Sequence, residues 1–133
     1  MKYRNVGKSG LKVSQIAMGS WKTDLQGSEK AAVAEETIRK AYDAGVNFFD
    51  CADAYSGGEA EKFLGRVLKD YSRSSYVVSS KVFFPTGRGA NEWGLSRKHI
   101  FENIFLNQIS LFSSSVISHI NAAIFPVLTS GII

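Results

Sequence analysis

Three short apolar runs alternate with segments of helical periodicity, and this alternation constrains the fold more than any other feature. The runs are 14–19, 46–50 and 76–82, and helical patterns follow them over 28–44, over 59–69 and from 96 onward. Strands that alternate with helices favour parallel β/α units joined by right-handed crossovers. Ahead of them, two short strand-like runs flank a Gly-Lys-Ser-Gly turn and predict a β-hairpin over 3–13. We therefore expect an α/β fold with an N-terminal hairpin and about three βα units.

The helical segments carry recognisable end signals. Ser28 and Ser96 are suited to N-cap positions, and Gly45 stands where a helix of this length needs a C′ glycine. The segment 59–69 has a single apolar stripe, which is the pattern of a helix buried on one face. The stripe consists of Ala60, Phe63, Leu64, Val67 and Leu68.

Charge and cysteine content exclude several classes of function. The net charge is +4, and the basic residues are scattered, which gives no support for nucleic-acid binding. Cys51 is the single cysteine, so an intrachain disulfide cannot form, and a reducing, cytoplasmic location is expected. His119 has no carboxylate or thiol near it in sequence, so we expect no metal site.

The charges stop abruptly. Every Asp, Glu, Lys and Arg lies at or before Glu102, and residues 103–133 mix Ile, Phe and Val with Ser and Asn. A segment of this composition has no charged face to present to water. We therefore divide the sequence into residues 1–104 and an uncharged apolar and Ser-rich tail, 105–133.

Two of the predicted strands end in charged side chains. Asp50 ends the run 46–50, Lys81 lies near the end of 76–82, and Tyr55 follows Asp50 by five residues. Ends of parallel strands are where β/α barrels collect catalytic groups. A carboxylate favours a charged ammonium, and an ammonium stabilises a phenolate, so Tyr55 could donate a proton to a developing alkoxide. The competing interpretation is a strand-end salt bridge beside a packed tyrosine, and spacing alone leaves the two equally open.

Three other reactive side chains receive structural interpretations. We expect Asp53 to be a solvated loop residue or a turn-former. Cys51 has no nearby base and is expected to be a small buried residue. His99 lies beside Lys98 on a helix face that we expect to be exposed.

Several motifs, taken in order, resemble those of the aldo-keto reductase superfamily, and the closest branch is that of the voltage-gated potassium channel β-subunit-like reductases. The resemblance covers residues 3–104. It is carried by residues 5–14, Gly19-Ser20-Trp21, 45–50, Gly58-Glu59-Ala60-Glu61 and 94–100. The fold that it implies is a (β/α)8 TIM barrel, of which this chain would form the N-terminal part.

The resemblance also implies a reaction, the NADPH-dependent reduction of aldehydes or ketones to alcohols. By residue-by-residue transfer, Tyr55 is the proton donor, Lys81 makes it acidic, and Asp50 pairs with Lys81. The residues expected near the nicotinamide end of NADPH are Ser20, Trp21, Gln26 and Asp50. The implied partners are a small carbonyl substrate, a channel-like membrane protein and a second copy of the chain.

The sequence departs from the family in its second half. The family's fourth catalytic residue, a His on the next strand, has no counterpart here, and the phosphate-binding segments belong to the C-terminal half of the barrel. We therefore expect a truncated and inactive reductase fragment. The alternatives are a potassium channel β-subunit-like regulatory protein and a non-functional product of intron retention or a frameshift near Ile104.

Overall fold

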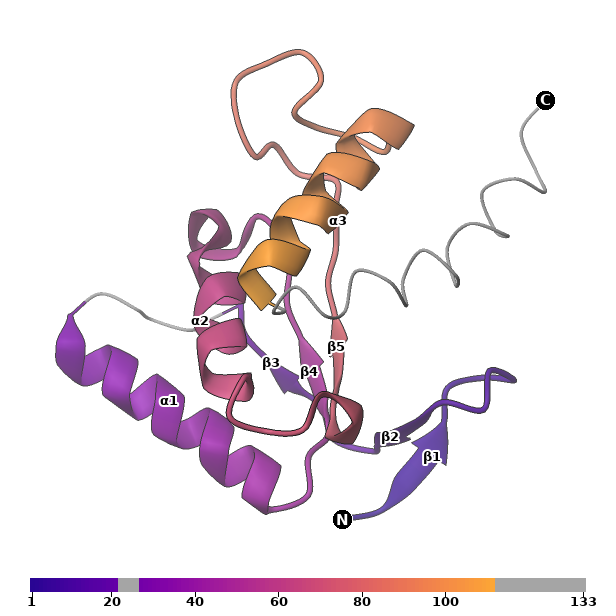
Figure 1. Ribbon diagram of the computed structural model, residues 1–133, viewed down its shortest axis with the longest axis vertical. Helices are drawn as coiled ribbons and strands as arrows, with labels where there is room; N and C mark the ends of the chain where they lie inside the picture. Colours follow the sequence, from indigo (N-terminus) through magenta and orange to yellow (C-terminus); the bar gives the residue numbers. More distant parts are fainter. Residues whose placement is uncertain (22–26, 112–133) are drawn as a thin grey trace.

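The computed structural model describes the backbone of residues 1–21 and 27–111. Figure 1 shows the arrangement of the elements. The strands are β1 (Tyr3–Asn5), β2 (Lys12–Ser14), β3 (Met18–Gly19), β4 (Phe48–Asp50) and β5 (Val77–Ser79). The helices are α1 (Ser28–Asp43), α2 (Glu59–Leu68) and α3 (Arg97–Leu111), with short 3-10 helices η1 (Tyr55–Gly58) and η2 (Arg73–Ser75).

Two sheets form in the described part of the chain. β1 and β2 pair antiparallel, which confirms the predicted hairpin. The second sheet has the order β3-β4-β5, with both pairs parallel. Its register places Gly19, Asp50 and Ser79 side by side at one edge. The element order and the parallel pairing agree with three βα units.

The strands of the parallel sheet are shorter than the apolar runs that predicted them. The backbone N–H of Val46 caps α1 by bonding to Ala41 O at 2.9 Å, so Val46 does not extend β4. The side chain of Asn47 is also engaged elsewhere, because its Oδ1 accepts a hydrogen bond from Ser14 N at 2.7 Å. β4 therefore begins at Phe48, and Lys81 lies two residues beyond the end of β5.

The core lies between the parallel sheet and the helices. Phe49 of β4 is fully buried, and the predicted apolar stripe of α2 is buried along its whole length. Fully burying a side chain of this size contributes about 1.5–3 kcal/mol. α2 contacts both α1 and α3, and Figure 1 shows α1 and α2 on the same side of the sheet. Because α2 is the helix most extensively packed, it anchors the layer that covers β4.

The hairpin is attached to the end of β4 that lies away from Asp50. Ser14 and Asn47 exchange hydrogen bonds, with Asn47 N donating to Ser14 Oγ at 3.2 Å. The hydroxyl of Tyr3 donates to Gly45 O at 2.8 Å. The opposite end of the sheet, which carries the strand-end charges, is thereby left clear of the hairpin (Figure 1).

The helix-end signals are correct in two cases of three. Gly45 N bonds to Tyr42 O at 2.8 Å, and the bond from Val46 to Ala41 completes a Schellman motif. Ser96 Oγ accepts from His99 N at 3.2 Å, as an N-cap should. The prediction for Ser28 is wrong by one residue, because Gly27 occupies the N-cap and no side chain caps α1.

The division of the sequence at residue 104 falls inside α3, which continues to Leu111. Residues 112–133, including His119, lie outside the described residues. The division therefore stays a prediction.

We expect Gly45→Ala to lower the free energy of unfolding by about 1–3 kcal/mol. Gly45 has φ +91°, and an added Cβ would lie 2.9 Å from Met1 Cβ and 3.2 Å from Tyr3 Oη. Gly19→Ala is the matched control, because Gly19 has no heavy atom within 4 Å of its added Cβ and no positive φ. Urea denaturation of both variants measures the difference. Equal loss of stability in the two variants would contradict this account of α1 termination.

Candidate active site

Asp50 and Lys81 form an ion pair at the carboxyl edge of the parallel sheet. Lys81 Nζ lies 2.6 Å from Asp50 Oδ2, and it also donates to Cys51 O at 2.6 Å. The backbone around the pair is held as well, because Cys51 N bonds to Ser79 O and Asp53 N bonds to Lys81 O. The predicted contact between the two strand ends is therefore present.

Tyr55 completes the predicted trio. Its ring centroid lies 4.8 Å from Lys81 Nζ, within the range of a cation–π contact. Tyr55 begins η1, in which Ser56 adopts a left-handed conformation with φ 52°. Such a backbone is uncommon for a residue other than glycine, and together with the two glycines that follow it turns the chain sharply into α2. This tight turn is what holds Tyr55 beside the strand ends.

The electrostatics keep both members of the ion pair charged. Burial works against ionisation of Asp50, but hydrogen bonds from Lys81 and Ser79 outweigh it and hold the carboxyl pKa below its ordinary value. Burial likewise opposes the charge on Lys81, but interactions with Asp50 and Tyr55 outweigh it and raise the ammonium pKa. Near neutral pH the site therefore presents an ammonium to the phenol of Tyr55.

The segment after β3 reaches the same edge. Ser20 N and Ser20 Oγ both donate to Asp50 O, at 2.9 and 3.0 Å. Trp21 follows directly, and this residue is 67% exposed. Gln26, the third residue predicted to approach a cofactor, lies outside the described residues. The structure thus brings Ser20 into contact with Asp50, and it leaves the cofactor role of all three residues a prediction.

The expected exposure of Asp53 and His99 was wrong, although Asp53 does lie in a turn. Asp53 is only 6% exposed, and its Oδ2 has no hydrogen-bond partner among the described residues. Burial raises the pKa of this carboxyl. His99 is 2% exposed, and Asn103 Nδ2 contacts its ring and donates to its backbone oxygen at 2.9 Å. The side of α3 that bears His99 and Asn103 is buried. Both residues are polar, so the apolar pattern that predicts a buried helix face does not include them. The prediction for Cys51 is confirmed, since it is fully buried.

Sequence reasoning missed two further residues at the site. Ser79 Oγ donates to Asp50 Oδ1 at 2.6 Å. Glu61 of α2 is buried and accepts a short hydrogen bond from Ser80 Oγ. Burial raises the pKa of the Glu61 carboxyl. Alternate residues of an extended chain project on the same side. The sequence could therefore have predicted Ser79 at the site, because it lies two residues before Lys81.

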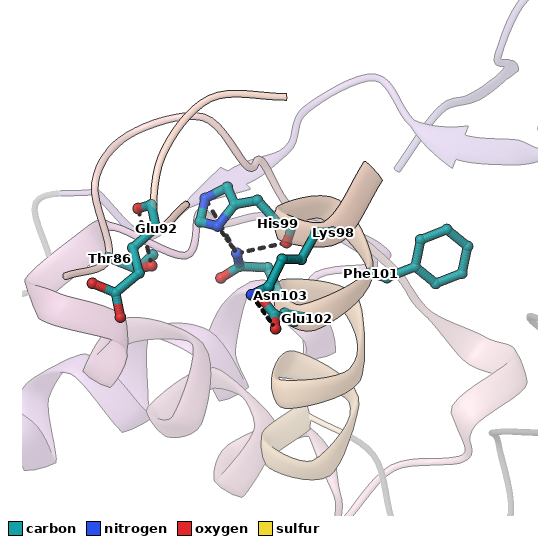
Figure 2. Close-up of a pocket in the computed structure, with 7 residues that line it drawn as sticks. All are labelled: Thr86, Glu92, Lys98, His99, Phe101, Glu102 and Asn103. Carbon is teal, nitrogen blue, oxygen red and sulfur yellow. Dashed lines mark hydrogen bonds and ion pairs between the residues drawn. The ribbon is translucent and has the colours of Figure 1, made fainter. Parts of the chain in front are cut away.

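A separate pocket of about 550 Å³ lies between the loop after β5 and α3. Figure 2 shows Lys98 reaching Glu102, at 2.6 Å, and Asn103 turned toward His99. The lining residues are Thr86, Glu92, Lys98, His99, Phe101, Glu102 and Asn103. None of them belongs to the Asp50–Tyr55–Lys81 trio, so this pocket and the strand-end chemistry are distinct.

The structure also bears on metals and membranes. Within residues 1–21 and 27–111, no group of three or more His, Cys, Asp or Glu side chains is arranged to hold a metal ion. No helix in the same part of the chain has the length and apolar character needed to cross a membrane.

Known proteins are similar to this chain in fold and in sequence. The chain matches a solved structure of a thermostable aldo-keto reductase in complex with the inhibitor epalrestat, with a TM-score of 0.69 and 24% identity. The match covers 84% of this chain and 39% of that one. The described elements therefore have the fold of part of a (β/α)8 barrel.

Sequence comparison supplies the family. Residues 15–106, more than half of the chain, match the Aldo/keto reductase family model. The chain is 44% identical over 106 residues to a protein of rice, Oryza sativa subsp. japonica, named "Probable voltage-gated potassium channel subunit beta". That match covers 78% of this chain and 32% of the rice protein, so the chain spans about a third of the length of this relative. The chain belongs to the aldo/keto reductase family.

We expect the free energy of unfolding of Asp50→Asn to fall less steeply at acid pH than that of the unmodified chain. The pKa of Asp50 is lower in the folded than in the unfolded state, so its contribution is present above the ordinary value of about 3.9 and is lost as pH falls through the folded value. Asp53→Asn should act in the opposite direction, because burial raises the Asp53 pKa in the folded state. Urea unfolding from pH 7 to pH 2 compares the slopes. The idea fails if both variants change the slope in the same direction.

Proposed function

We propose that this chain carries the proton-donating part of the active site of an NADPH-dependent reductase that converts aldehydes or ketones to alcohols. One observation carries the proposal: Lys81 Nζ is held at 2.6 Å by Asp50 while it faces the ring of Tyr55 at 4.8 Å. Membership of the aldo/keto reductase family supports the reaction class.

The roles follow from the charges. When bound, NADPH would provide the hydride that the carbonyl carbon needs for this reduction. The hydroxyl of Tyr55 donates its proton to the carbonyl oxygen, which becomes the alcohol. The Lys81 ammonium stabilises the phenolate that remains, and the Asp50 carboxylate keeps Lys81 protonated and in place.

The chain's own residues fit the nicotinamide end of the cofactor. Ser20 is held against the backbone of Asp50, and the exposed indole of Trp21 lies next to it in sequence. An exposed indole offers an aromatic surface on which a flat ring can stack. We place Ser20, Trp21, Gln26 and Asp50 near that ring, and we infer a cytoplasmic location from the single buried cysteine.

A second candidate function is that of a regulatory protein for a membrane channel. The name of the rice relative favours it, at 44% identity. Under this proposal the partner is a channel-like membrane protein, and the functional unit is a homo-oligomer. Co-purification with membrane channels separates this function from catalysis, because a reductase acts on small carbonyl substrates without such a partner.

We expect Tyr55→Phe to abolish carbonyl reduction while cofactor binding is retained. The test uses a chimera in which residues 1–104 precede the remaining two thirds of the rice relative, assayed by NADPH oxidation with a panel of aldehydes. Loss of general acid catalysis typically costs about 10²–10⁴-fold in rate. Tyr71→Phe is the control, because the Tyr71 ring stacks on Tyr42 of α1 and the Tyr55 ring faces Lys81. Undiminished turnover in the Tyr55 variant would remove Tyr55 from the reaction.

The isolated 133-residue polypeptide should bind NADPH more weakly than about 1 µM and reduce no aldehyde. The reason is that the phosphate-binding segments implied by the family lie in the other part of the barrel. Quenching of the fluorescence of Trp21 and Trp93 on titration with NADPH measures the affinity. A dissociation constant of about 1 µM or tighter would show that residues 1–133 hold the cofactor without those segments.

A further inference from the structure

Ser79 holds one oxygen of the Asp50 carboxylate while Lys81 holds the other. Ser79 Oγ donates to Oδ1 at 2.6 Å, and Lys81 Nζ donates to Oδ2 at 2.6 Å. The two donors are two residues apart on the same extended segment, so both project toward Asp50. The carboxylate is therefore bonded at both oxygens, by the last residue of β5 and by a residue two positions beyond it.

The backbone pairing of β4 with β5 places Ser79 next to Asp50. Asp50 and Ser79 are register partners in the β4–β5 pair. The hydrogen bond from Cys51 N to Ser79 O, at 2.8 Å, fixes the two strand ends beside each other. Ser79 Oγ is thus presented to the carboxylate by the sheet itself.

Hydrogen bonds to both oxygens fix the orientation of a carboxylate. The terminal torsion of an aspartate side chain is broad and roughly two-fold, so a carboxylate bonded at only one oxygen can turn. If Asp50 turns, Oδ2 moves away from Lys81, and only the bond from Lys81 Nζ to Cys51 O then helps to hold Lys81 near the Tyr55 ring.

We infer that Ser79 is a positioning residue of the site: its hydroxyl orients the Asp50 carboxylate so that Oδ2 faces Lys81, and Lys81 is thereby held against Tyr55. The inference rests on the proposed function for its catalytic meaning. Lys81 is the charged group in contact with Asp50, and Tyr55 is the titratable group beyond Lys81.

The neighbouring serine supplies a matched control. Ser80 differs from Ser79 by one position and has its own carboxylate partner, since its hydroxyl bonds to Glu61 of α2. Removal of the Ser80 hydroxyl deletes a hydrogen bond of the same kind at the same strand end. Asp50 keeps both of its donors in that variant.

The test is a carboxyl-carbon NMR titration of Asp50 in the 133-residue chain. In the unmodified chain the midpoint should lie below the ordinary value of about 3.9. In Ser79→Ala it should rise toward that value, and solvent exchange of the Lys81 Nζ protons should become faster. Ser79→Thr keeps the hydroxyl and should keep the low midpoint, and Ser80→Ala should leave Asp50 unchanged.

Amide spectra establish that each variant is folded. If Ser79→Ala does not fold, Ser79→Cys replaces the hydroxyl with a weaker donor and should give an intermediate midpoint. An Asp50 midpoint that is the same in all folded Ser79 variants would overturn the inference. The titration reads the Asp50 carboxyl and not reduction, so its outcome is separate from that of Tyr55→Phe in the chimera. Full activity of that chimera variant would refute the proposed function and leave the role of Ser79 as an orienting group intact.

Discussion

The parallel pairing of β4 with β3 and β5 is the constraint on which the rest of the structure depends. It aligns Gly19, Asp50 and Ser79 at one edge and leaves Phe49 fully buried beneath the helices. A shift of one residue in either pair would exchange the buried and exposed faces of the strand. The core and the strand-end site are therefore set by the same register, and the burial of Phe49 against α2 stabilises both.

The Asp50–Lys81 pair contributes more to orientation than to stability. The two side chains are 37% and 49% exposed, and ion pairs at such exposure are worth about 0–1 kcal/mol. Burial of single core side chains contributes more than that. The value of the pair lies in its geometry, because its ammonium also bonds to Cys51 O and faces Tyr55. A contact that is weak as a stabilising interaction can still fix the position of a reactive group.

Apolar patterns in the sequence predicted much of the fold, but they did not predict which polar residues are buried. The stripe of α2 and the Schellman end of α1 could be identified in advance because burial and backbone geometry each demand particular residue types. Asp53 and His99 were expected in solvent, yet both are buried, and Glu61 is buried with them. Polar residues are common on surfaces, so their sequence neighbours do not reveal when a second element covers them. That information lies in the packing of α2 against α3.

The sequence by itself determined the order of strands and helices, the family, and the residue types that stand at the strand ends, because these depend on local periodicity and on motifs within short segments. Only the tertiary structure decided which further groups surround the predicted trio. The hydrogen bond from Ser79 to Asp50, the hydrogen bond from Lys81 to Cys51 O and the burial of Asp53 each depend on segments distant in sequence or covered by another element. Such contacts follow from strand register and helix packing, which no local pattern specifies.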